Sequence, residues 1–216
     1  MAANNISGMV NLAPTRNPFN YDKVVQTSRD LATAWLTLDE ITQQLNLFGD
    51  ESQDDYLSGL EVAVRMHIED YLGLPIFNQS YTVYYGASAL YGTPLTLDLP
   101  EISQSGTVIN SVKYYNDASP TILTTVAASS YYYDVTGNKV ILNDLPTDLN
   151  TFMTSPVVCN YTISSSILAQ YPVIKQAGLL LLTHLYNNRS ETTAGALQKI
   201  PFGVDVLLRQ YKPLVM

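Results

Sequence analysis

The chain has 216 residues, enough for one domain, or two small ones, with a real hydrophobic core. Its composition, 46% hydrophobic and 14% charged, argues against general disorder. The formal net charge of -8 argues against a protein that grips nucleic acid tightly, because such affinity comes mainly from Lys and Arg neutralising phosphates. This charge is compatible with an acidic surface along which nucleic acid slides without being held.

Residues 1–35 are rich in Asn, Ala, Thr and Ser and show no sustained hydrophobic period. We predict an extended arm that is ordered only where something holds it. The first ten residues lack both the basic start and the apolar stretch of a secretory signal, so synthesis and retention in a cytoplasm are expected. Cys159 is the single cysteine, which excludes an intramolecular disulfide and a cysteine zinc cluster.

Two helices are predicted between residues 36 and 75. Thr37 opens the sequence T-L-D-E, a capping box in which Thr37 and Glu40 satisfy each other's backbone N–H groups, and a short helix to about Leu47 follows. The second helix begins near Tyr56, has apolar residues at steps of three and four, and ends at Gly73. These apolar residues are Leu57, Leu60, Val64, Ile68 and Tyr71.

The hydrophobic period changes from helical to two over residues 76–163, which predicts an antiparallel β module of five to seven short strands. Residues 81–85, 108–114 and 157–163 alternate in the manner of half-buried strands. Residues 131–142 are expected to form a hairpin around the turn Thr136-Gly137-Asn138.

A third helix, residues 170–189, is apolar round most of its circumference. Pro172 suits its first turn, and Val173 and Leu180 lie on one side of it while Ile174 and Leu181 lie on another. Such a helix must be covered on several sides, so we interpret it as the centre of a helical bundle or of a subunit interface; it is too short to span a membrane.

The predicted fold class is therefore α+β: a small helical bundle, residues 36–75 and 164–211, with the antiparallel β module inserted between the second and third helices. A last helix after Pro201 shows helical spacing up to Tyr211. Residues 212–216 form a tail, and its apolar end is expected to have a partner.

No residue pattern predicts catalysis, a metal site or a cofactor. His67 and His184 have no second ligand at metal-binding spacing, and Cys159 lies in a predicted strand, so structural roles are favoured for all three. A nucleophile elbow, a phosphate-binding loop and a dinucleotide fingerprint are absent from the sequence, so we do not expect an enzyme.

The chain has 16 tyrosines, many of them in the β module. Tyr84, Tyr91, Tyr115 and Tyr132 are candidates for stacking on sugars or on single-stranded nucleic acid, which leaves a carbohydrate-binding β module as an alternative function. Tyrosine also favours strands and protein interfaces, where its ring is buried and its hydroxyl stays paired. We favour this second interpretation.

Five motifs occur in an order that resembles head–tail connector proteins of tailed bacteriophages, the adaptor or head completion family. They are L-T-L-D-E-I at 36–41, E-D-Y-L-G-L-P-I at 69–76, I-N-S-V-K-Y-Y at 109–115, I-K-Q-A-G-L-L-L-L-T-H-L-Y-N-N-R at 174–189 and P-F-G-V-D-V-L-L-R at 201–209. The resemblance covers roughly residues 36–211. The arm before Leu36 departs from the family pattern.

This resemblance implies a structural virion protein, made in the cytoplasm of a bacterial host, that forms a dodecameric ring beneath the portal at the head–tail interface. It implies a DNA channel through which double-stranded DNA passes without specific recognition, and as partners the portal protein, a downstream neck or tail protein and further copies of the chain, with no membrane. A tail-side neck completion protein is the alternative. The residues expected to dock on the portal are Leu214, Val215 and Met216, and those expected at the subunit interface are Leu179, Leu182, Tyr186, Tyr84, Tyr115 and Tyr132.

Overall fold

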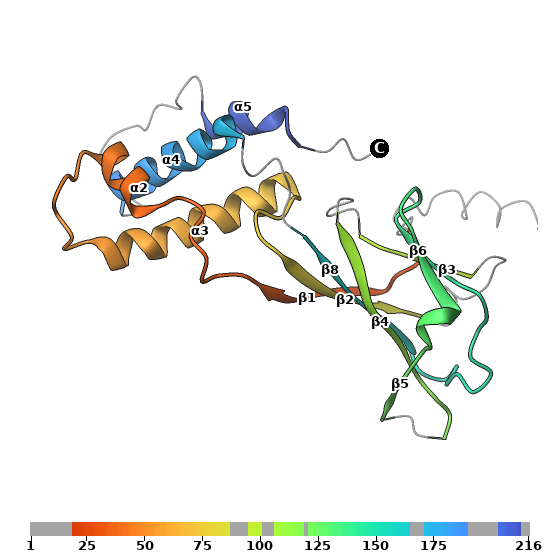
Figure 1. The fold of residues 1–216 in the computed structure, drawn as a ribbon. Coiled ribbons are helices and arrows are strands. Elements are labelled where there is room, and N and C mark those ends of the chain that lie inside the picture. The colour runs from red at the N-terminus through yellow and green to blue at the C-terminus, as the bar shows by residue number, and fades with distance from the viewer. Residues whose placement is uncertain are drawn as a thin grey trace, which may run out of the picture. The chain divides into compact units, whose positions relative to one another are not determined.

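The structure, a computed structural model of the chain, describes residues 19–86, 95–100, 106–118, 121–164, 171–189 and 203–212. Within these ranges it has four α-helices and two antiparallel sheets, which confirms the α+β class (Figure 1). The chain divides into two compact units. One comprises residues 1–24, 83–100 and 111–159, and the other comprises residues 25–82, 101–110 and 160–216.

The helices begin and end close to the predicted positions: α2 spans Leu38–Leu45, α3 Asp54–Leu72, α4 Pro172–Asn187 and α5 Val204–Arg209. The predicted capping box is present, because the Glu40 N–H donates to Thr37 Oγ1 at 3.2 Å and the Thr37 N–H donates to Glu40 Oε2 at 2.9 Å. At the end of α3, Gly73 has a φ of 64°, the left-handed conformation that glycine adopts without a Cβ clash.

The four helices share one hydrophobic core. In Figure 1, α4 lies alongside both α3 and α5, and these pairs are in contact. The buried members of the core are Trp35, Leu36, Ile41, Leu57, Val64, Ile68, Leu72, Ile76, Ile174, Ala177, Leu182 and Leu208.

Helix α4 is fully buried along only one side. Its buried residues are Ile174, Ala177, Gly178 and Leu182. At 100° per residue, Val173 and Leu180 lie on the solvent-facing side of the helix, between the exposed Gln176 and His184, and both are half-buried. Within one chain, therefore, the described residues bury the helix less completely than its apolar sequence predicts.

Two buried charges fix the segment that leads into α2. Arg65 and Glu61 lie one turn apart on α3, with Arg65 Nε 3.6 Å from Glu61 Oε1, and their side chains are only 1% and 3% exposed. Arg65 Nη1 donates to the Asp30 carbonyl at 2.8 Å, and Glu61 Oε1 accepts from the Trp35 N–H at 3.0 Å. Both ends of residues 30–35 are thus hydrogen-bonded to α3.

The strands form a five-stranded sheet and a three-stranded sheet. The five-stranded sheet has the order β1 (Lys23–Arg29), β2 (Gln79–Tyr85), β8 (Val157–Ile163), β4 (Thr107–Tyr115) and β5 (Leu123–Thr125). The three-stranded sheet has the order β3 (Leu95–Asp98), β7 (Lys139–Leu142) and β6 (Tyr131–Asp134), and the short 3₁₀ turn η2 (Ala128–Ser130) precedes β6.

Strands β6 and β7 are the predicted hairpin. Tyr131 pairs with Leu142 and Asp134 pairs with Lys139 in an antiparallel register, and Asn138 in the turn has a φ of 50°. This conformation suits Asn, because its short polar side chain tolerates the left-handed region better than most residues.

One element differs from the sequence-based expectation: β1 lies inside the range predicted as an extended arm. It is an edge strand whose residues are exposed or half-buried, so it lacks the apolar alternation that identifies a strand in a sequence. In chain order β2 to β8 follow α3 and precede α4. The division into a helical bundle and an inserted β module stays a prediction, as do the domain boundaries.

Candidate functional site

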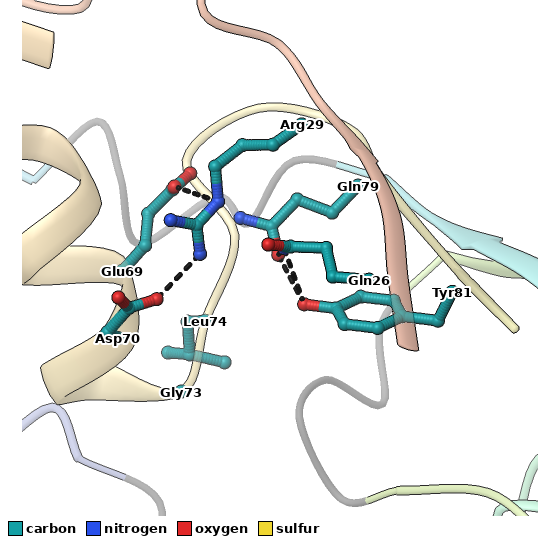
Figure 2. A pocket seen from close by; sticks show the side chains of 8 residues that line it. All are labelled: Gln26, Arg29, Glu69, Asp70, Gly73, Leu74, Gln79 and Tyr81. Carbon is teal, nitrogen blue, oxygen red and sulfur yellow. Dashed lines mark hydrogen bonds and ion pairs between the residues drawn. The ribbon is translucent and has the colours of Figure 1, made fainter. Parts of the chain in front are cut away.

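The end of α3 and the strands β1 and β2 enclose a pocket of about 290 Å³. Its lining is drawn in Figure 2 and comprises Gln26, Arg29, Glu69, Asp70, Gly73, Leu74, Gln79 and Tyr81. All eight residues belong to the unit that contains the helices. Most of the lining side chains carry polar groups, but most of the surface that faces the pocket is apolar, with Leu74 and the Tyr81 ring among its apolar side chains.

Glu69 connects the end of α3 to the turn that leads into β2. The Ile76 N–H donates to Glu69 Oε1 at 2.7 Å, and the Phe77 N–H donates to the same oxygen at 3.4 Å. Gly73 lets the chain turn here, and its own N–H donates to the Glu69 carbonyl at 2.8 Å. Glu69 is therefore held at the pocket by the local backbone.

An arginine from β1 lies between two carboxylates of α3. Arg29 Nε is 3.4 Å from Glu69 Oε2, and Arg29 Nη2 is 2.6 Å from Asp70 Oδ1 (Figure 2). Burial raises the pKa of the Glu69 carboxyl, and the Ile76 N–H and the Arg29 charge partly oppose that rise. Asp70 differs in its surroundings, because its side chain is 65% exposed.

The strand side of the pocket is a compact hydrogen-bond network. Tyr81 Oη donates to Gln79 Oε1 at 2.6 Å, and Gln26 Nε2 lies within hydrogen-bond distance of both Gln79 Oε1, at 3.2 Å, and Tyr81 Oη, at 3.1 Å. Burial raises the pKa of the Tyr81 hydroxyl, so it stays protonated and able to donate at neutral pH.

The side chains that line this pocket can donate and accept hydrogen bonds. It combines one guanidinium, two carboxylates, two amides and a phenol. The described residues contain no cluster of three or more His, Cys, Asp or Glu side chains arranged to hold a metal ion.

The sequence did not predict this pocket. The motif E-D-Y-L-G-L-P-I at 69–76 indicates the end of a helix. The two adjacent carboxylates in this motif, Glu69 and Asp70, were the only local sign of a polar site there. Arg29 lies 40 residues before Glu69 in a range that predicts no strand, so their pairing could not be inferred from local patterns.

The interface candidates on α4 have different environments. Leu182 is fully buried in the core of its own chain, whereas Leu179 and Tyr186 are half-buried and pack against the edge of that core. Tyr186 Oη donates to Gln53 Oε1 at 3.1 Å, and the Arg189 guanidinium lies 4.7 Å from the centre of the Tyr186 ring. Leu179 and Tyr186 therefore keep surface for a neighbour, and Leu182 has almost none.

The tyrosine candidates of the strands lie on two different sheets. Tyr84 on β2 and Tyr115 on β4 are half-buried, and Lys23 Nζ lies 5.6 Å from the centre of the Tyr84 ring. Tyr132 on β6 is 54% exposed. Tyr91 lies outside the described residues, as do Leu214, Val215 and Met216. Four other tyrosines are buried, in agreement with the interpretation that many tyrosines pack the sheets: Tyr81, Tyr85, Tyr114 and Tyr161.

His67, His184 and Cys159 do not line the pocket. His67 and His184 are exposed on their helices. Cys159 is buried in β8 as expected, and burial raises the pKa of its thiol to about 12. The thiolate is the reactive form of cysteine, so this thiol is unreactive at neutral pH. Among the described residues, none of the helices has the length and apolarity needed to cross a membrane.

Neither a protein-family model nor the sequence of a curated protein matches this chain. Solved structures do share its fold. A chain from the neck of an empty gene transfer agent (GTA) particle, computed with C6 symmetry, aligns with a TM-score of 0.63 at 22% identity, over 90% of this chain and 97% of its own. A chain from the neck of a native GTA particle, computed with C12 symmetry, aligns over the same shares with a TM-score of 0.59 at 19% identity. A chain from the virion of the native particle gives a TM-score of 0.57 at 18% identity.

Proposed function

We propose that this chain is a structural virion protein of the neck, which forms a dodecameric ring beneath the portal and connects the DNA-filled head to the tail. The observation that carries the proposal is the shared fold: 90% of the chain aligns with 97% of a chain from a GTA neck. The five ordered motifs over residues 36–211 support the same conclusion from the sequence, independently of the shared fold.

A ring requires each subunit to offer apolar surface to its neighbours. Helix α4 has such surface, because Val173 and Leu180 lie on its solvent-facing side and are only half-buried. Leu179 and Tyr186 lie on another side of the helix, next to Leu182, but are half-buried and remain candidates for the interface, together with Tyr84, Tyr115 and Tyr132. Leu182 is not proposed for it, since it is buried in its own chain.

The charge of the chain agrees with a conduit for DNA. With 19 acidic and 11 basic residues, a ring of copies carries a large negative charge. DNA binding depends chiefly on cationic side chains that neutralise phosphates, so DNA would pass such a ring without being held. Passage of double-stranded DNA would then be independent of its sequence.

The first experiment measures assembly. Mass photometry of the purified chain, alone and with its portal protein, followed by electron microscopy of the mixture, should give rings attached to the portal end. A chain that stays monomeric and never binds the portal would contradict the proposal. The same microscopy separates the alternative of a tail-side neck completion protein, which would bind the tail-side neck component and leave the portal free.

A matched pair of variants tests the role of α4. Leu182→Asp places a charge at a fully buried position and should prevent folding. Leu180→Asp changes the half-buried outer side and should leave a folded chain that no longer forms rings. Rings of normal size from Leu180→Asp would exclude this side of α4 from the interface.

Deletion of Leu214, Val215 and Met216 tests portal docking. Because these residues follow the last predicted helix, the shortened chain should fold and form rings but bind the portal more weakly. Unchanged portal binding would refute the docking role of the tail.

A further inference from the structure

The start of α3 and the end of α4 hold an exposed arginine against two tyrosine rings. The Arg189 guanidinium lies 4.5 Å from the centre of the Tyr56 ring and 4.7 Å from the centre of the Tyr186 ring. Arg189 Nη2 donates to Gln53 Oε1 at 2.6 Å, and Arg189 Nε donates to the Tyr186 carbonyl at 3.3 Å. These four residues, the Arg189 cluster, belong to the unit that contains the helices. Their contacts fix a charged side chain that stays exposed to solvent.

The Arg189 guanidinium keeps donors for a further partner. Of its five N–H groups, one on Nε and one on Nη2 are used, and both N–H groups of Nη1 have no acceptor within the described ranges. The ion pairs of these ranges involve other cations: Arg29, Arg65, Lys139 and Lys175. Because stacking and two hydrogen bonds already restrict the Arg189 side chain, an incoming anion would cost little of its conformational freedom.

The charges near the cluster restrict what that anion can be. The fork of a guanidinium fits a carboxylate or a phosphate. Asp54 and Asp55 follow Gln53 at the start of α3, and Asp55 is exposed. Double-stranded DNA carries one negative charge per about 1.7 Å of its axis, so this surface would repel its row of phosphates more strongly than a single carboxylate. The chain itself offers exposed carboxylates elsewhere, among them Asp39, Glu51, Asp117 and Asp144.

We propose that the Arg189 cluster binds an acidic side chain of a second copy of this chain. Tyrosine and arginine are enriched at the energetically important positions of protein interfaces, which suits the composition of the cluster. The cluster and its carboxylate partner lie at different positions of the chain, so the contact is heterologous and can repeat from copy to copy until a ring closes. The choice of a second copy rests on the proposed ring and on the excess of 19 acidic over 11 basic residues.

Analytical ultracentrifugation over a range of concentrations measures the self-association of the full-length chain and of two matched charge reversals. Arg189→Glu places a like charge opposite the partner's carboxylate and should raise the concentration for half-maximal assembly about tenfold or more. Arg209→Glu makes the same change at an exposed arginine of α5, outside the cluster, and should leave that concentration nearly unchanged. Equal losses in both variants would overturn the inference, because overall charge would then explain the effect.

Chemical labelling of the unsubstituted chain gives a second reading that does not depend on the folding of a variant. Phenylglyoxal modifies accessible guanidinium groups, and mass spectrometry of the resulting peptides identifies the arginines that react. Arg189 should react in the dilute monomer and should be protected in the assembly. Rings in which Arg189 reacts as fast as in the monomer would overturn this inference and leave the proposed ring intact.

Three other outcomes separate the inference from the ring. Dimers or short oligomers that are lost in Arg189→Glu would support the inference and refute the ring. A chain that stays monomeric at every concentration would refute both. Fluorescence anisotropy with double-stranded DNA tests the phosphate alternative. DNA binding that Arg189→Glu abolishes, with self-association unchanged, would overturn the inference, because the guanidinium would then bind phosphate.

Discussion

Two helical glycines in different surroundings provide a stringent test of the packing around α4. Gly178 lies in α4 and is buried, and a Cβ added there would lie 2.7 Å from Trp35 Cζ3, 2.9 Å from Trp35 Cη2 and 3.3 Å from Leu36 Cδ1. Gly59 lies in α3 and is exposed, and a Cβ added there would have no atom within 4 Å. The same substitution to alanine therefore probes a filled space at one site and an open space at the other.

The expected magnitudes follow from two opposing effects. Alanine is more favourable than glycine inside a helix by about 1 kcal/mol, and this gain applies at both sites. Carbon atoms normally approach to ~3.5 Å, so a methyl group on Gly178 forces the Trp35 ring to move, and overpacking of this kind costs about 1–3 kcal/mol. The ring has little freedom to move, because Trp35 is buried and its backbone N–H donates to Glu61 Oε1, which holds in place the main chain from which the ring projects. Gly59→Ala should therefore stabilise the chain by roughly 0.5–1 kcal/mol, and Gly178→Ala should be less stable than Gly59→Ala by about 1–3 kcal/mol.

Urea denaturation measures both effects. Trp35 is the only tryptophan, so its fluorescence reports unfolding at the site itself, and far-ultraviolet circular dichroism gives a second reading from the helices. The slope of the transition should be the same for both variants, so that the midpoint alone carries the difference. If Gly178→Ala were as stable as Gly59→Ala, the close packing of Trp35 on α4 would be refuted.

Three further predictions use the buried polar groups. Arg65→Met leaves the Glu61 carboxylate buried without its partner and should lower the free energy of unfolding by about 3–5 kcal/mol; a loss under ~1 kcal/mol in the same denaturation assay would contradict this. Burial raises the pKa of Glu69 above its ordinary value of 4.5, so the unfolded chain loses this proton first as the pH rises, and the free energy of unfolding should fall with pH above about 4.5. The fall should be smaller in Glu69→Gln, which keeps an acceptor for the Ile76 N–H, and equal pH profiles would exclude Glu69 as the cause. Cys159, with a pKa of about 12, should react with a thiol reagent at neutral pH only after unfolding in urea, and rapid labelling of the folded chain would show that β8 opens readily.

The parts of the fold that could be predicted are those set by neighbouring residues. The capping box at Thr37, the end of α3 at Gly73 and the hairpin at residues 131–142 each depend on residues a few positions apart, and all three are confirmed. Strand β1 was not predicted, because an exposed edge strand needs no apolar alternation. The pattern of such a segment resembles that of an extended arm.

The pocket could not be predicted, because it depends on contacts between distant segments. Arg29 is separated from Glu69 by 40 positions, and Gln26 is separated from Gln79 by 53. Their contact follows from the pairing of β1 beside β2, and sequence periodicity does not specify which strands are neighbours. The sequence of α4, apolar round most of its circumference, likewise predicts that the helix is covered, without showing which side is covered by its own chain.

The solvent-facing side of α4 supports a physical argument about assembly. Val173 and Leu180 are only half-buried among the described residues. Exposed apolar area costs free energy in an isolated subunit, and a neighbouring polypeptide that packs on this side would remove that area from water. The stability of such a subunit then depends on its partners, because the contacts that cover α4 form only when they bind.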